Sequence, residues 1–282
     1  MRSTVAVFLL FISLACQKNV APDLYRSRQA LLQEGLSRVL EGQEFLPRGK
    51  TLFVFDFDHT LGDTVTTIPV RSGDGKIRQM DSKCMDLVAG EEPDYSVFNA
   101  AEVAATTPIA PAFDLLRRVQ LTDTAVIVTA RGQPDTVMNL RAYLLNRGAQ
   151  PVAIFAINTQ EMQTHIWKPL QQKGEALPGQ LKKPFIIAGL VDRARAQGVK
   201  FERIEYHEDT DRYVTGSIEL LGGLFPEMRI DVYDYIRTPG SPNVYRQEKA
   251  ISYADGRWRL PDQRPFREGA VYESGDCPVS SP

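Results

Sequence analysis

Five apolar runs recur along the middle of the chain, and their pattern predicts the strands of a buried parallel sheet. Most are continuous runs of β-branched, aromatic and other apolar residues, as expected for strands that are covered on both faces. The runs are Leu52–Phe55, Thr124–Val128, Val152–Ile157, Phe201–Tyr206 and Met228–Ile236. The last run alternates between apolar and polar residues, which indicates a strand at the edge of the sheet.

Helical spacing of apolar residues predicts helices before and between these strands. The first covers Asp23–Glu41, with Asp23 as a suitable N-cap, and is interpreted as a packing helix between the amino terminus and the core. The others are predicted over Ala112–Gln120, Pro134–Arg147, Lys182–Ala196 and Thr215–Leu221. Thr159–Gln180 is predicted to be irregular, and its length makes it a candidate lid element.

Turn-forming residues predict two β-hairpins outside the five runs. One is centred on Ser72–Gly75, within the stretch of about 60 residues that separates the first two strands. The other is centred on Ala254–Gly256, in the C-terminal region 237–282, and a loosely ordered tail is expected from residue 264 onward. The chain therefore consists of a strand-rich core with one insertion and one C-terminal appendage.

The amino terminus has a composition of its own and predicts a secretory signal peptide over residues 1–15. Arg2 gives it a positive start, and Val5–Leu14 is apolar but too short to span a bilayer. Cys16 after a small residue resembles the lipidation site of a bacterial lipoprotein, which implies a lipid anchor at the periplasmic face of the cell envelope. Ser13 departs from the aliphatic residue usual at its place. A signal cleaved without lipid, which leaves a soluble periplasmic protein, is the alternative.

The overall composition fits one domain with appendages. The chain has 282 residues, of which 43% are hydrophobic, and a formal net charge of −2. This length can bury one sizeable core, and the near-zero charge gives no electrostatic reason to expect nucleic acid or an anionic membrane surface as a partner. If Cys16 carries lipid, Cys84 and Cys277 are left as a candidate disulfide pair, although nothing in the sequence shows that they are close in space.

Acidic residues follow directly after the first predicted strand, where burial makes them costly. Asp56 and Asp58 come at the end of Leu52–Phe55, with Thr60 two residues further on. A carboxylate without a partner there loses its hydration, and ligands bind at the carboxyl ends of strands in open α/β sheets. A divalent cation or a phosphoryl group explains both acids, and we prefer this interpretation to two solvated loop residues.

The pentapeptide Asp56–Thr60, DFDHT, resembles the first motif, DxDxT, of the haloacid-dehalogenase-like (HAD) phosphohydrolases. Residues that resemble the remaining motifs follow in order. The second run leads into Thr129-Ala130-Arg131, a lysine opens the helix before the fourth run, and Glu208-Asp209 follows that run. Lys183 is the preferred candidate for the motif lysine, and Lys182 is the second candidate.

The resemblance covers about residues 50–236 and implies a fold for them. This fold is a Rossmann-like parallel sheet of about five strands with helices on both faces. Residues at about 65–110 would form a small flap or lid over the site, without a full cap domain. Residues 16–49 would then be anchor, helix and linker, and the C-terminal hairpin would lie outside the catalytic core.

The resemblance also implies a covalent mechanism. Asp56 would attack phosphorus and form an aspartyl-phosphate, and Asp58 would protonate the leaving oxygen and then activate water. Lys183 would neutralise charge on the phosphoryl group and the nucleophile. Mg²⁺ would be held by the Asp56 carboxylate, the Asp58 carbonyl and Asp209.

Contacts to the phosphoryl oxygens are implied for a further set of residues. They are Thr60, Thr129, Ala130, Arg131 and Lys183. The Thr129 hydroxyl and the backbone N–H groups beside it suit this task. For Arg131 a substrate clamp and a pairing with a structural acid are both open. His59 would duplicate Asp58 as an acid, so a packing or supporting role is preferred.

These residues favour an exported Mg²⁺-dependent phosphomonoesterase that acts on small phosphomonoesters such as nucleotides or sugar phosphates. One alternative is a non-catalytic envelope-binding or assembly lipoprotein on the same fold. Another is a phosphatase or phosphotransferase that acts on nucleic-acid ends, which export disfavours. The sequence leaves the oligomeric state and the choice between hydrolase and phosphotransferase open.

Overall fold

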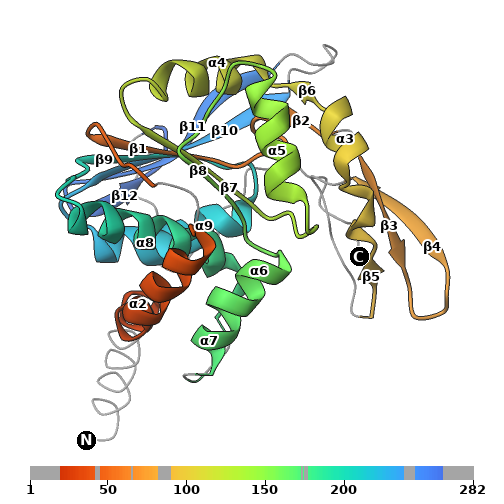
Figure 1. Cartoon of the computed structure of the whole chain (residues 1–282), viewed down its shortest axis with the longest axis horizontal. Coiled ribbons are helices and arrows are strands. Elements are labelled where there is room, and N and C mark those ends of the chain that lie inside the picture. Colours follow the sequence, from red (N-terminus) through yellow and green to blue (C-terminus); the bar gives the residue numbers. More distant parts are fainter. Residues whose placement is uncertain are drawn as a thin grey trace, which may run out of the picture.

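The chain folds as an α/β structure around one large mixed sheet (Figure 1). The computed structural model describes residues 20–41, 45–64, 66–81, 90–172, 174, 177–237 and 245–262. The predicted signal peptide, Cys16, Cys84, Cys277 and the predicted tail from residue 264 lie outside these residues. Among the described helices none is long and apolar enough to cross a membrane.

Within the described residues the central sheet has seven strands in the order β12-β11-β10-β9-β1-β7-β8. The five strands from β10 to β8 run parallel, whereas β11 and β12 are antiparallel. The parallel strands are β1 (Thr51–Phe55), β7 (Thr124–Thr129), β8 (Ala153–Ala156), β9 (Arg203–His207) and β10 (Arg229–Arg237). All five predicted strands are confirmed, and β1 lies in the middle between β7 and β9.

The predicted C-terminal hairpin is confirmed, and it extends the sheet. β11 (Tyr245–Ala254) pairs with β10, and β12 (Arg257–Arg259) pairs with β11. The prediction that the fifth run is an edge strand is therefore wrong, because β10 has a neighbour on each side. Its alternating pattern has a different cause, since polar side chains such as Asp231 are buried in ion pairs with basic neighbours.

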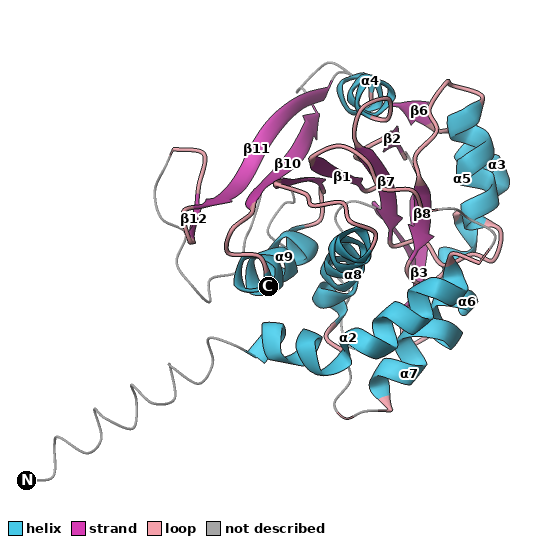
Figure 2. Ribbon diagram, turned by 60° about the vertical axis from the view of Figure 1, so that its left-hand side comes forward, coloured by secondary structure: helices cyan, strands magenta, loops and turns pink. Residues whose placement is uncertain are grey.

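Two layers of helices pack against alternate side chains of the parallel strands. On β1, Leu52 and Val54 belong to a core shared with α2, α8 and α9, whereas Phe53 and Phe55 belong to a core shared with α4 and α5. Figure 2 shows the two layers on opposite sides of the strands. The helices are α2 (Val20–Val39), α4 (Ala110–Val119), α5 (Thr136–Leu145), α8 (Lys182–Ala196) and α9 (Asp211–Leu224). The predicted helices are confirmed, with ends shifted by a few residues.

Helix α2 is packed into the core. Tyr25, Leu32 and Leu36 are buried, and the Tyr25 hydroxyl donates a 2.6 Å hydrogen bond to Asp192 on α8. The predicted N-cap is wrong: the helix already includes Val20, and Asp23 lies within it, where its carboxylate accepts from Arg26.

The residues between β1 and α4, 62–108, form an insertion beside the main sheet (Figure 1). The predicted hairpin is confirmed as β3 (Thr67–Arg71) and β4 (Ile77–Asp81), and β5 (Glu92–Pro93) pairs with the other side of β3. A short pairing of β2 (Gly62–Asp63) with β6 (Thr107–Pro108) joins the two ends of the insertion. Between them lie a 3₁₀ turn, η1 (Tyr95–Val97), and helix α3 (Ala100–Ala105).

The segment predicted to be irregular, Thr159–Gln180, is mostly helical. It contains α6 (Gln160–Met162), a π-helical turn η2 (Gln163–Trp167), α7 (Lys168–Gln171) and a 3₁₀ turn η3 (Gly179–Leu181). Ile166, Trp167 and Leu170 are buried in the core shared with α2. Tertiary packing therefore sets the conformation of this segment, and the part that carries these residues is core.

A substitution at Gly35 tests how closely α2 packs on the segment Thr159–Gln180. A Cβ at Gly35 would overlap the carbonyl oxygen of His165 and come within 2.9 Å of the Ile166 side chain. We expect Gly35→Ala to lower the free energy of unfolding by about 1–3 kcal/mol, measured by urea denaturation. In a helix without tertiary contacts, the same change would raise it by about 1 kcal/mol. Gly73→Ala is the control, because a Cβ at Gly73 meets nothing within 4 Å.

Candidate active site

The candidate site lies where three neighbouring strands of the sheet end. Asp56 follows β1, Thr129 ends β7, and Glu208 and Asp209 follow β9. Because β1 lies between β7 and β9 and all three are parallel, their C-terminal ends meet at one edge of the sheet. Lys183, in the first turn of α8, reaches the same edge.

A buried ion cluster is the centre of this site. The Lys183 side chain is 0% exposed, and its amine lies 3.0 Å from the Asp56 carboxylate and 2.7 Å from that of Glu208. The Tyr213 ring lies 4.3 Å from the same amine. The adjacent Lys182 turns elsewhere, to the Asn158 side-chain oxygen at 3.1 Å. Of the two lysines that the sequence left open, Lys183 is the one beside Asp56.

Glu208 is held by several hydrogen bonds. Its carboxylate accepts from the Tyr206 hydroxyl at 2.5 Å and from the Thr210 backbone N–H at 3.0 Å, in addition to Lys183. The sequence placed Glu208 in the acidic pair that resembles the fourth motif and left its role open. The available signal was its position directly after a buried strand, the same position that Asp56 has after β1.

Burial and charge shift the pKa values of both central partners. Burial raises the pKa of Asp56 to about 7, with Glu208 and Asp58 adding to the rise and Lys183 opposing it. Burial would lower the pKa of Lys183, but the Asp56 and Glu208 carboxylates hold it above its ordinary value. The amine is therefore charged at neutral pH, whereas Asp56 is balanced between its two protonation states.

Three acids at this edge are close enough to share a cation. One carboxylate oxygen from each of Asp56, Glu208 and Asp209 lies within 4.8 Å of the others, and all three residues are buried. One ammonium group does not neutralise three carboxylates, so the cluster keeps a negative charge. Carboxylate oxygens are the ligands that Mg²⁺ prefers, and the cluster therefore fits a divalent cation. Of the predicted metal residues, Asp56 and Asp209 belong to this triad, and the Asp58 carboxylate does not.

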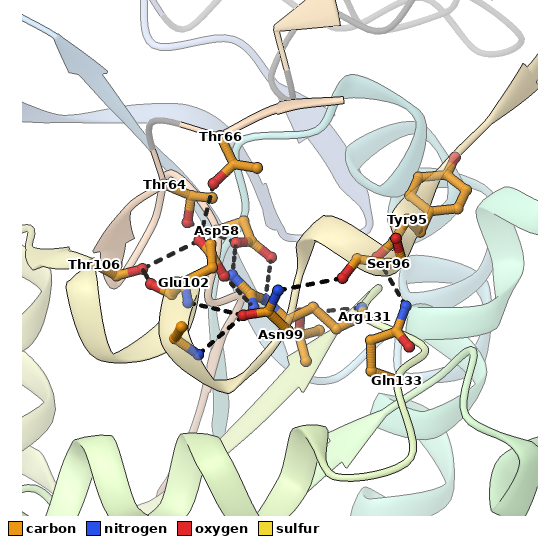
Figure 3. Close-up of polar contacts among 12 residues, drawn as sticks. Asp58, Thr64, Thr66, Tyr95, Ser96, Asn99, Glu102, Thr106, Arg131 and Gln133 are labelled. Atoms are coloured by element: carbon orange, nitrogen blue, oxygen red, sulfur yellow. Dashed lines mark hydrogen bonds and ion pairs between the residues drawn. The ribbon is translucent and has the colours of Figure 1, made fainter. Parts of the chain in front are cut away.

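The Asp58 carboxylate is bound by Arg131 instead (Figure 3). The guanidinium makes two contacts with it, at 2.6 and 3.0 Å, and the Thr64 hydroxyl donates a third at 2.6 Å. Burial would raise the pKa of Asp58, but the charge and hydrogen bonds of Arg131 outweigh it and hold the pKa below its ordinary value. Asp58 is therefore an ionised carboxylate in this arrangement.

Arg131 also binds the insertion. Its remaining guanidinium nitrogen lies 2.7 Å from Glu102 on α3. The guanidinium carbon lies 5.0 Å from the centre of the Phe57 ring and 4.8 Å from that of Phe98. The Arg131 side chain is only 1% exposed. Of the two roles that the sequence left open for Arg131, this structure contains the pairing with acids. Glu102 carried no sequence signal, because its position depends on the fold of the insertion.

The other predicted phosphoryl contacts lie close by. Thr60 is fully buried, and its hydroxyl has no hydrogen-bond partner among the described residues. Thr129 is also fully buried. The carbonyl of the next residue, Ala130, accepts a hydrogen bond from the Asn158 side chain at 2.6 Å. His59 has a positive φ of 55° in the tight turn after Asp58, which fits a supporting role in that turn.

This geometry can hold an anion and a cation side by side. It has a carboxylate beside an ammonium, two further acids, and hydroxyl and backbone groups at the end of a neighbouring strand. Searches of protein-family models, curated proteins and solved structures found no significant match to this chain.

The buried contacts of Arg131 should be energetically coupled. We expect Glu102→Gln to lower the free energy of unfolding by about 1–3 kcal/mol and Arg131→Met by about 3–5 kcal/mol, because each leaves buried polar groups without a full set of partners. The double variant should cost clearly less than the sum of the two. Urea denaturation of all three variants measures this coupling.

Glu202→Gln is the matched control, since Glu202 pairs with Lys50 on the surface, where both side chains are exposed. It should change the unfolding midpoint little. If the loss of unfolding free energy in the double variant equals the sum of the losses in the Glu102→Gln and Arg131→Met variants, the two residues are not coupled.

Proposed function

We propose that this chain is a Mg²⁺-dependent phosphomonoesterase that acts through an aspartyl-phosphate on Asp56. The observation that carries the proposal is the buried Asp56 carboxylate held 3.0 Å from Lys183, with Glu208 and Asp209 beside it. A buried cluster of acids is costly unless something uses it. Its place at the C-terminal edge of parallel strands is where ligands bind in α/β sheets.

The order of the elements supports the resemblance to HAD phosphohydrolases. Motif-like residues follow β1, β7 and β9 and start α8, in the order of that family's motifs. We infer a Rossmann-like catalytic core over about residues 50–236, in which the insertion acts as the flap or small lid. The five parallel strands with helices packed against both faces support this inference.

In the first step an Asp56 oxygen would form a bond to phosphorus while the bond from phosphorus to the leaving oxygen breaks. Lys183 would offset charge on the nucleophile and the phosphoryl group, since its amine is charged and fixed. The hydroxyls of Thr60 and Thr129 and the N–H of Ala130 would contact phosphoryl oxygens. The leaving oxygen needs a proton, which is the role proposed for Asp58.

Asp58 is ionised while Arg131 holds it, so it cannot donate a proton in the arrangement described. We infer that Arg131 shifts towards the phosphoryl group when substrate binds, which allows Asp58 to take up a proton from solvent before it donates that proton to the leaving oxygen. In the second step Asp58 would accept a proton from the water that attacks phosphorus. That attack breaks the Asp56–phosphorus bond and releases phosphate, which returns Asp56 to its starting state.

Mg²⁺ fits the acidic triad by charge and by ligand type. Asp56 and Asp209 would hold it, the Asp58 carbonyl is the third expected ligand, and Glu208 is available beside them. When bound, the ion offsets the repulsion between an anionic nucleophile and an anionic substrate.

We also propose that the protein is exported and anchored through lipid on Cys16. The support is the apolar segment that ends in Ala15-Cys16. Cells that express the full chain should incorporate radiolabelled fatty acid into it, and Cys16→Ser should abolish the label. An unlabelled wild-type protein would reduce the proposal to a soluble periplasmic enzyme.

Asp56→Asn tests the nucleophile. We expect it to lower the turnover of p-nitrophenyl phosphate with Mg²⁺ by about a thousandfold or more, because an amide cannot form the acyl-phosphate. Asp74→Asn, at the exposed tip of the β3–β4 hairpin, should leave turnover unchanged. Circular dichroism checks that both variants are folded. Wild-type turnover in Asp56→Asn would exclude the mechanism.

Mg²⁺ binding should depend on pH through Asp56. A carboxyl with a pKa raised to about 7 keeps its proton below that pH, and the proton competes with the cation. We therefore expect added Mg²⁺ to raise the melting temperature more at about pH 8 than at about pH 5.5. The effect should be much smaller in Asp56→Asn at both values. An equal shift at both pH values in the wild type would place the ion elsewhere.

A further inference from the structure

Two cations beside the Asp56–Lys183 cluster have no carboxylate partner among the residues that the structure describes. Lys182 is the first residue of α8, and Arg212 is the second residue of α9. The backbone N–H groups at a helix N-terminus already make the field there positive, so a cation in the first turn is disfavoured. Each residue therefore stands where an anion would be more stable.

Lys182 contacts the loop that follows β8 and, through it, the loop that follows β7. Its amine binds the Asn158 side-chain oxygen at 3.1 Å and lies 5.6 Å from the centre of the Trp167 ring. The Asn158 amide in turn donates to the Ala130 carbonyl at 2.6 Å. Burial lowers the pKa of Lys182, and the charge of Arg212 lowers it further, so the two cations act on each other.

Arg212 is tied to the other side of the cluster. Its guanidinium lies 4.8 Å from the centre of the Tyr213 ring and donates to the Tyr213 hydroxyl at 3.3 Å. The same ring faces the Lys183 amine. The charge of Arg212 also opposes the rise that burial causes in the pKa of Tyr95 on η1.

Neutralising the charge of the acidic triad does not explain why Lys182 and Arg212 are there. Lys183 already contacts Asp56 and Glu208, whereas the amine of Lys182 binds a neutral amide and the guanidinium of Arg212 a neutral phenol. Tyr213 links Arg212 to the Lys183 amine, and Asn158 links Lys182 to the Ala130 carbonyl at the end of β7. A small anion that bound beyond the phosphoryl group would relieve their mutual repulsion and complement both helix N-termini.

We propose that Lys182 and Arg212 form an outer subsite for a second anionic group on the substrate. This inference rests on the proposed phosphomonoesterase function and narrows its substrate class. The substrates are phosphomonoesters whose leaving group carries a further phosphate or carboxylate. The scissile phosphoryl group binds at Asp56 and Lys183, and the second anion binds between Lys182 and Arg212.

Pairs of substrates that differ only in the second anionic group test this proposal. Glucose bisphosphate is compared with glucose monophosphate, and phosphoglycerate with glycerol phosphate, by kcat/KM with Mg²⁺. The wild type should prefer the doubly charged member of each pair by about tenfold. The preference should arise mainly in KM and shrink as salt is added.

Three variants separate the subsite from general effects of charge. Lys182→Met combined with Arg212→Met should abolish the preference, and Lys182→Arg combined with Arg212→Lys should keep most of it. Arg118→Met should keep all of it, because Arg118 is an exposed arginine near the end of α4, at the edge of the sheet where β7 begins. Melting temperatures check that each variant is folded.

The outcomes distinguish this inference from the proposed function. Turnover of p-nitrophenyl phosphate without any preference in the wild type would overturn the subsite and leave the phosphatase intact. A preference that survives in the double methionine variant would overturn it too. Absence of turnover with every phosphomonoester would overturn the function and the subsite together.

Discussion

The site depends on one interaction, the buried contact of Lys183 with Asp56 and Glu208. Without the ammonium, three buried acids within 4.8 Å of one another would stand at the ends of β1 and β9 with little solvent to separate their charges. Lys183 makes this arrangement tolerable but does not neutralise it, and the remaining negative charge suits a divalent cation. The position of Lys183 is set by α8, which packs closely on α2: a Cβ at Gly189 would come within 2.7 Å of Leu36. Packing between α2 and α8, away from the candidate site, therefore fixes the position of Lys183.

Arg131 is the second constraint, because it joins the insertion to the DFDHT loop. Its guanidinium contacts Asp58 and Glu102 and lies over the rings of Phe57 and Phe98. The insertion is thereby docked on the core at the residue proposed as the general acid. In the proposed mechanism, release of Asp58 for proton transfer requires a change at Arg131, which is also the residue that contacts Glu102 of the insertion.

The sequence predicts well those strands and helices in which the pattern of apolar residues matches the burial of the side chains. Continuous apolar runs marked β1, β7 and β8, because these strands are covered on both faces, and the helix Lys182–Ala196 was predicted with both ends correct. The pattern of apolar residues gave wrong predictions where tertiary contacts determine the conformation of the chain. Strand β10 is polar on alternate residues through buried ion pairs of Asp231, and Thr159–Gln180 is helical because Trp167 and its neighbours are packed under α2. In the site, acids after strands were visible in the sequence, whereas the contact of Glu102 with Arg131 required the fold of the whole insertion.

Phosphorylation of Asp56 during turnover can be detected by quenching the reaction in acid, because acyl-phosphates survive at low pH. The protein is mixed with p-nitrophenyl phosphate and Mg²⁺, quenched in acid during turnover, and digested, and the peptides are examined by mass spectrometry. We expect a phosphoryl group on the peptide that contains Asp56, and this group should be lost on brief treatment with base, as an acyl-phosphate is. Phosphate release with no label on Asp56, or with the label on another residue, would contradict the proposed mechanism.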